Sequence, residues 1–344
     1  MKINIQKFFL VLFVFSITLT QCTCGNKKNN APKIDSSKVG LQFYRFDKDF
    51  QQEGTKNTKN RMLALRAKYN TFYDVYVYDL MRFANAYDTT DRVYANINSF
   101  FEFKDMNQLY NLVQKAYPTT EVNDEEIRKA YAYSKIYLPR MKMPNKIVYC
   151  MSGLNVGAFT VDTDFVGIGL DMYLNNDTLY NQVFPNYIAA KLRKEMMCQN
   201  VMKALYNNQY GDPYIATGAL INCIIQVGKQ QYYLEKVLPH IAEEYRFGYS
   251  YKQLKWCEDN EKLIWKFMAD KDLFYNESEA EIRHFIGEQA NTHGMPPESP
   301  GNVGAWIGYR IVSAYMEQSN NKPSLDELIQ TDPKTILAKS KYKP

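Results

Sequence analysis

The sequence predicts a mainly helical α+β fold with one small antiparallel sheet. Three short apolar segments, at 146–150, 157–161 and 165–170, read as strands that follow one another closely enough to pair as neighbours. Much of the remaining chain carries apolar residues at helical spacing. No linker-like stretch interrupts 41–344, so we expect these residues to form a single domain.

Local signals place the other elements. A further strand is expected at 41–47, where aromatic residues open the domain. Capping boxes, in which a serine is followed three residues later by Gln or Glu, begin helices at Ser250 and Ser324, and Asn123 with Glu126 has the same offset. The expected helices cover 57–68, 72–87, 105–116, 123–137, 186–208, 214–234, 251–268, 307–318, 325–330 and a terminal segment from 333.

An aromatic stripe lies within 72–87. Tyr73, Tyr76, Leu80 and Phe83 repeat at helical spacing, and this spacing extends beyond the usual length of a strand, so we predict a helix. Such a stripe can grip a glycan or a peptide, but its usual role is packing in the core. We therefore interpret it as core.

The first 24 residues have the order of a lipoprotein signal peptide. Lys2 and Lys7 precede an apolar run at 8–19, and cysteines follow it. The run is shorter than the roughly 20 apolar residues that a membrane-spanning helix needs. We therefore expect cleavage and attachment to the membrane through a lipid anchor.

The expected lipidation site is Cys22, because Leu19 stands three residues before it. Gln21 fits poorly where a small residue is usual, so Cys24 is the second candidate. Residues 25–40 are polar and lack apolar periodicity, and we interpret them as a flexible tether between lipid and domain. No acidic cluster follows the cysteine, which favours the periplasmic face of the outer membrane.

The charge and the cysteine pattern argue against several classes of protein. Without Lys2 and Lys7 the formal net charge falls from +5 to +3, and the basic residues are scattered, which argues against a nucleic-acid partner. No Cys-x-x-Cys pair is present, so a zinc ribbon is unsupported. Most of the four later cysteines lie in apolar helical contexts typical of core residues, although a disulfide stays open: Cys150, Cys198, Cys223 and Cys257.

The segment Lys194-Glu195-Met196-Met197-Cys198 lies within the longest helix that we predict, at 186–208. In zinc peptidases of the His-Glu-x-x-His type, two ligands stand four residues apart on one helix with a glutamate between them. Here those positions hold Lys194 and Cys198. A lysine is protonated at neutral pH and donates only, and one thiol does not hold a metal alone. No metal site and no cofactor are therefore expected.

Other catalytic patterns are also missing from the sequence. The three histidines, His240, His284 and His293, lie in different segments without ligand spacing. Ser152-Gly153 lacks the Gly-x-Ser-x-Gly elbow, and Gly167-Ile168-Gly169 lacks the rest of a dinucleotide fingerprint. We name no catalytic residue.

Six segments, spread over nearly the whole chain after the signal, carry a family resemblance. They are Phe43-Tyr44-Arg45-Phe46-Asp47, Gly167-Ile168-Gly169-Leu170-Asp171-Met172-Tyr173-Leu174, Gly248-Tyr249-Ser250-Tyr251, Trp256-Cys257-Glu258-Asp259-Asn260-Glu261, Ser299-Pro300-Gly301-Asn302-Val303-Gly304-Ala305-Trp306-Ile307-Gly308-Tyr309-Arg310-Ile311-Val312 and Ile336-Leu337-Ala338-Lys339-Ser340-Lys341-Tyr342. Together they resemble the gliding-motility lipoprotein GldB family of Bacteroidetes-type bacteria.

That family is in turn similar to predicted zinc peptidases, which implies a degenerate zincin-like core. The resemblance would place the ligand pair on Lys194 and Cys198, the general base on Glu195 and the third ligand on Val227. Of these four, Glu195 alone is of the required type. The resemblance therefore implies a pseudo-enzyme, with Lys194, Glu195, Cys198 and Val227 around a pseudo-active cleft that is either collapsed core or a groove for a partner.

Two functions follow from the resemblance. The first is a non-catalytic envelope lipoprotein, a structural or assembly component of gliding motility or of the associated secretion apparatus, with envelope proteins of that machinery as partners. The alternative is a peptidase or amidase with an altered metal site. Ligands converging near Glu195 would favour the alternative.

Overall fold

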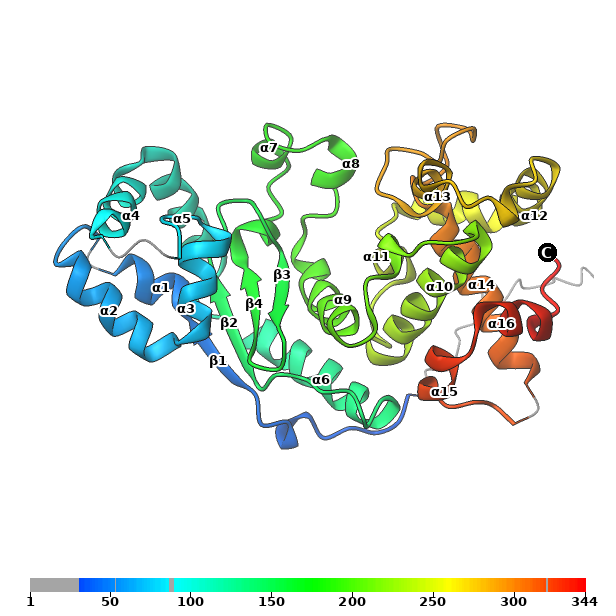
Figure 1. Ribbon diagram of the computed structural model, residues 1–344, viewed down its shortest axis with the longest axis horizontal. Coiled ribbons are helices and arrows are strands. Elements are labelled where there is room, and N and C mark those ends of the chain that lie inside the picture. The colour runs from blue at the N-terminus through cyan, green and yellow to red at the C-terminus, as the bar shows by residue number, and fades with distance from the viewer. Residues whose placement is uncertain (1–30, 53, 87–89, 320) are drawn as a thin grey trace, which may run out of the picture. The chain divides into compact units, whose positions relative to one another are not determined.

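The strands form one mixed sheet in the order β1-β2-β4-β3 (Figure 1). They cover Gln42–Arg45 (β1), Lys146–Cys150 (β2), Ala158–Val161 (β3) and Phe165–Gly169 (β4). The computed structural model describes residues 31–344 except 53, 87–89 and 320. Within it, 32–344 make one compact unit.

The antiparallel sheet expected from the sequence is wrong for two of the three pairings. Strand β2 runs parallel to both β1 and β4, and only β3 is antiparallel to β4, as a hairpin. Parallel neighbours need a long crossover connection, and the helices between β1 and β2 supply it. Proximity in the chain therefore predicted the strands correctly but not their order.

Helices account for most of the remaining described residues, as predicted. They are α1 Phe46–Gln51, α2 Thr58–Tyr69, α3 Thr71–Asp74, α4 Arg92–Glu102, α5 Lys104–Ala116, α6 Glu121–Tyr137, α7 Asp177–Tyr180, α8 Asn186–Ala189, α9 Met197–Tyr210, α10 Leu220–Val237, α11 Glu243–Phe247, α12 Tyr251–Asp270, α13 Glu279–Ile286, α14 Val303–Gln318, α15 Leu325–Gln330 and α16 Pro333–Ser340. Short 3-10 turns cover Ser36–Lys38, Leu170–Tyr173, Lys194–Met196, Pro213–Ile215 and Leu273–Tyr275, and a π-helical turn covers Val75–Leu80.

The aromatic stripe is core, as predicted. Tyr73, Tyr76 and Phe83 are buried, and Tyr76 packs edge-on against Phe46 of α1. Edge-to-face ring contacts recur through this cluster and stabilise it beyond simple area burial. The predicted helix at 72–87 is observed as α3 followed by the π-helical turn, and the turn ends at Leu80.

The capping signals were right at two positions and wrong at one. Ser250 and Ser324 both form capping boxes, at the starts of α12 and α15. Asn123 does not cap α6, because that helix begins at Glu121 and Thr120 precedes it. A polar residue three positions before a glutamate is thus also compatible with the interior of a first turn.

The long helix predicted at 186–208 is interrupted. It consists of α8, an extended residue at Arg193 (φ −124°, ψ 151°), the turn Lys194–Met196 and then α9. The backbone N–H of Lys194 donates to Asn175 Oδ1 at 2.6 Å, and Arg193 pairs with Asp177. Contacts with the loop 174–177 therefore replace helical bonds that the local sequence favours.

The helix expected at 214–234 also begins later than predicted, at Leu220. It crosses α14 where Gly228 faces Gly308, and a Cβ added to Gly228 would lie under 3.0 Å from backbone atoms of Gly308. Glycine at both positions lets the two backbones touch. This crossing fixes α10, whose C-terminal end borders the site described below.

The sequence predicts a signal peptide and a tether before the domain, and the structure describes only part of the tether. The signal peptide, Cys22 and Cys24 lie outside the described residues. Part of the expected tether packs on the domain: Val39 is buried, and Ser36 Oγ donates to Glu125 of α6 at 2.8 Å. Among the described helices, none has both the length and the apolar character needed to cross a bilayer.

Candidate functional site

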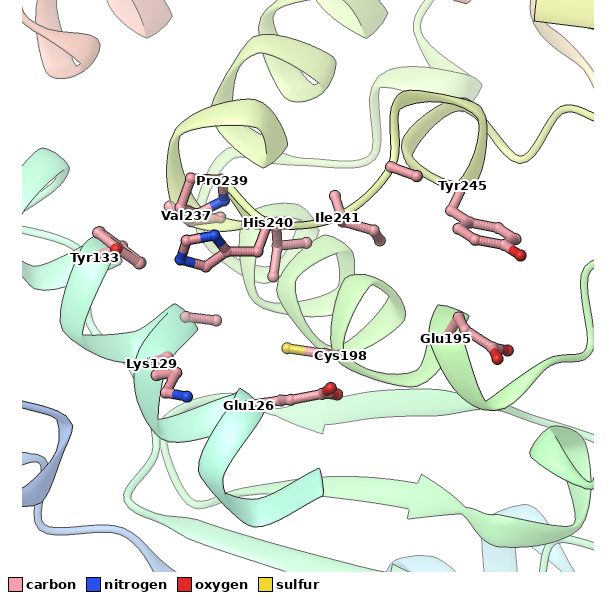
Figure 2. Close-up of a pocket in the computed structure, with 13 residues that line it drawn as sticks. Glu126, Lys129, Tyr133, Glu195, Cys198, Val237, Pro239, His240, Ile241 and Tyr245 are labelled. Atoms are coloured by element: carbon pink, nitrogen blue, oxygen red, sulfur yellow. The ribbon is translucent and has the colours of Figure 1, made fainter. Parts of the chain in front are cut away.

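Two of the four residues proposed for the cleft, Glu195 and Cys198, line one pocket of about 360 Å³ (Figure 2). We call it the apolar pocket. Helix α6 contributes Ala130 and Tyr133 to one wall, and residues 237–242, between α10 and α11, form another. Glu195 and Cys198 thus border an open space beside α9.

Lys194, in contrast, does not line this pocket. Its Nζ donates to the carbonyl of Ala116 at 3.3 Å and lies 4.9 Å from the ring centre of Tyr117. Ala116 is the last residue of α5, where helix carbonyls lack partners along the chain. Lys194 therefore caps a neighbouring helix.

We expect Lys194→Glu to lower the free energy of unfolding by about 1–2 kcal/mol. The change removes the bond to Ala116 and places a carboxylate at the negative end of the α5 dipole. Urea denaturation followed by circular dichroism measures the effect. Lys194→Arg keeps the charge and should stay near wild type, whereas equal stability of all three proteins would mean that Lys194 is an ordinary solvated residue.

Val227 is also outside the apolar pocket. It is fully buried in α10, beside Gly228 at the crossing with α14. An aliphatic side chain offers no donor atom to a metal. Among the described residues, no group of three or more His, Cys, Asp or Glu side chains is arranged to hold a metal ion.

The apolar pocket holds two acidic groups that differ in origin. Glu195 comes from the turn before α9, and Glu126 comes from α6, which sequence reasoning treated only as part of a cap. In Figure 2 both carboxylates lie below Tyr245 and the His240 loop. Sequence reasoning had no signal for Glu126, because nothing in the chain relates α6 to α9 before they pack.

Burial raises the pKa of Glu126, Lys129 partly opposes this shift, and Glu195 adds to it. The two carboxylates therefore interact unfavourably across the pocket. Burial also raises the pKa of the Cys198 thiol, and Glu126 raises it further. Since the thiolate is the reactive form of cysteine, Cys198 is a neutral, unreactive wall residue at neutral pH.

A second space of about 740 Å³ adjoins the first, and we call it the polar groove. Glu195 and Tyr245 line both spaces. The groove is bordered by 248–253 at the start of α12 and by 300–302 before α14. Two of the segments on which the family resemblance rests therefore meet at one surface, which their separation in sequence did not predict.

A buried hydrogen bond joins these two borders. Tyr249 Oη donates to the backbone carbonyl of Asn302 at 2.9 Å, and the Tyr249 ring stacks on Phe247. Gly301 is needed at the second border, because a Cβ there would lie under 3.0 Å from the backbone of Gln289. The wall of the groove is thus rigidly built.

The remaining candidates do not converge. His284 and His293 stack on each other with ring centres 4.3 Å apart, whereas His240 lines the apolar pocket. The four cysteines of the described chain are all buried and free, which agrees with their interpretation as core residues: Cys150, Cys198, Cys223 and Cys257. No disulfide links them.

Fold and site together define a mainly helical α+β protein with an apolar pocket beside Glu195 and Cys198. The chain belongs to the family described as gliding motility protein GldB, whose profile matches residues 27–344. This confirms the resemblance seen in the sequence. No curated protein and no solved structure matches the chain.

Proposed function

We propose that this protein is a non-catalytic, lipid-anchored component of gliding motility or of the associated secretion apparatus, with envelope proteins of that machinery as partners. The observation that carries the proposal is the family match over residues 27–344. The order of charge, apolar run and cysteine in residues 1–24 supports the anchor, and the lack of an acidic cluster after the cysteine favours the periplasmic face of the outer membrane.

The absence of catalysis is supported by what occupies the ligand positions. Lys194 is engaged with Ala116 and Tyr117, and Val227 is core. A catalytic zinc site needs three protein ligands, and these two positions supply none. The retained Glu195 then has no metal-bound water to activate, and the further relation to zinc peptidases is one of architecture at most.

One observation favours the alternative of a peptidase or amidase with an altered site. Glu126, Glu195, Cys198 and His240 line a single pocket, and these are residue types that enzymes use as acids, bases and nucleophiles. The protonated state of the Cys198 thiol counts against nucleophilic chemistry. The non-catalytic function is therefore the better supported of the two.

The test combines genetics with metal analysis. Deleting the gene in a gliding host should abolish colony spreading, and the full chain supplied in trans should restore it. Protein purified without chelators should contain well below one zinc per chain and should not cleave casein. Normal spreading of the deletion strain would contradict the motility role, and one tightly bound zinc per chain would support the enzyme.

A further inference from the structure

The apolar pocket and the polar groove form one continuous surface, because Glu195 and Tyr245 belong to both walls. Figure 2 shows these two side chains together at one end of the apolar pocket. A ligand that occupies both spaces must therefore have an apolar part and a polar part. Its two parts must be joined at Glu195.

Acidic groups dominate the free charge of this surface. Four glutamates line it: Glu126 and Glu195 at the apolar pocket, and Glu195, Glu244 and Glu298 at the polar groove. None of the four forms an ion pair with a lysine or arginine of the described chain. Burial raises the pKa of Glu126 most, Lys129 opposes this shift, and the nearby Glu195 adds to it.

Three of the four lysines and arginines that line the two spaces pair with acids outside them, and the fourth, Lys252, lines the polar groove without a described ion pair. Lys191 pairs with Glu288, and Arg193 pairs with Asp177 at 3.0 Å. Lys129 lies 3.7 Å from Glu125, which does not line either space. With four glutamates against Lys252, the surface favours a cation from outside the chain, and Glu126 and Glu195 are the carboxylates that the apolar pocket offers to it.

The groove also offers polar groups to a main chain. Tyr187 and Tyr251 line it, and Tyr251 is 70% exposed. Asn186, which is exposed, adds an amide group with both donors and an acceptor. Extended peptides are bound by such side chains when no free strand edge is available, and no residue of β1 to β4 lines either space.

We propose that this surface binds an extended segment of a partner protein, with an apolar side chain in the apolar pocket and an adjacent lysine or arginine between Glu126 and Glu195. This inference rests on the proposed function and names the chemistry of the partner. The mainly apolar lining of the first space favours an apolar anchor over a glycan, because most of its wall offers no partner to a sugar hydroxyl. Glu126 and Glu195, which form no ion pair with a described lysine or arginine, favour the adjacent lysine or arginine of the ligand.

The direct test selects ligands from a phage-displayed library of random heptapeptides on the full chain in detergent. The expected result is enrichment of a large apolar residue next to Lys or Arg. Enrichment of acidic peptides, or no enrichment above an empty surface, would overturn the proposal. Binding of a glycan array instead of peptides would identify the other occupant and would also overturn it.

A pocket-filling variant then locates the site. Ala242 is exposed at the rim of the apolar pocket, so Ala242→Trp should block it without disturbing the core. A selected peptide should bind this variant at least about tenfold more weakly, a loss of about 1.4 kcal/mol. The matched control is Ala95→Trp, at an exposed position of α4 that lines neither space, and it should bind like wild type. Equal binding by both variants would place the peptide elsewhere.

A charge variant tests the basic neighbour separately. The double variant Glu126→Gln with Glu195→Gln should keep the apolar preference in a new selection and lose the preference for Lys or Arg. Glu121→Gln, also on α6 but outside both walls, is the control. In wild type, affinity should fall as salt rises, and this fall should be smaller in the double variant. An unchanged preference for basic residues would contradict the assigned role of the glutamates.

Failure of this inference is distinguishable from failure of the proposed function. If deletion of the gene stops spreading but no peptide is selected, the motility role stands and the binding proposal is wrong. If peptides are selected as expected but the deletion strain spreads normally, the site stands and the motility role is wrong. Loss of spreading in Ala242→Trp, with Ala95→Trp normal, would support both.

Discussion

Gly228→Ala and Gly308→Ala are each expected to lower the free energy of unfolding by about 3 kcal/mol, since overpacking of a tight contact has this magnitude. A Cβ on Gly228 would lie under 3.0 Å from backbone atoms of Gly308, and one on Gly308 equally close to the backbone of Ile224. Backbone atoms of a helix cannot move aside as a flexible side chain can. Helices α10 and α14 would have to separate, and the core between them would lose contacts.

The direction of this effect is opposite to that of helix propensity. In an open helix, replacing glycine by alanine stabilises by about 1 kcal/mol. Gly40→Ala, outside the helices, is a control for the added methyl group alone, because no atom lies within 4 Å of a Cβ added there. Urea denaturation of the three variants gives the comparison. If Gly228→Ala were as stable as wild type, the close crossing of α10 and α14 would be wrong.

The second large effect is expected from Cys22→Ala. This change should move the protein from the membrane fraction to the soluble fraction and abolish gliding, because acyl chains supply about 0.8 kcal/mol for each buried CH₂ group. Mass spectrometry of wild type should find an acylated N-terminal cysteine at position 22. The expectation rests on the order of Lys2, Lys7, the apolar run and the cysteine.

Cys24→Ala is the matched control, because it removes the second candidate and leaves Cys22 in place. It should remain acylated and membrane-bound. Loss of the anchor in Cys24→Ala but not in Cys22→Ala would move the site to position 24. An unmodified wild-type protein that begins at Met1 would contradict the lipoprotein interpretation altogether.

The two effects act at different levels. The glycine variants destroy the α10–α14 contact and with it the position of residues 237–242, which border the apolar pocket. The cysteine variant leaves the domain intact and changes only where it resides. The two sets of variants therefore separate the stability of the domain from its attachment to the membrane.

The sequence by itself determined the local structure of this protein. The capping boxes at Ser250 and Ser324, the strands around 146–170 and the helical spacing of the aromatic stripe are all patterns of residues close in the chain. The family could also be identified from the sequence, because the resemblance depends on short segments. The profile match over residues 27–344 confirms that family. These patterns can be recognised without knowing which elements pack against each other in the fold.

Only the tertiary structure decided the sheet order, the break before Lys194 and the site. Strand β1 pairs with β2 from about one hundred residues away, and the loop 174–177 takes the bonds that would have continued a helix. Likewise α6 brings Glu126 to Glu195, while Lys194 turns to α5. The physical reason is the same in each case: these contacts join distant segments, and their free energy outweighs the local preferences that a sequence pattern reports.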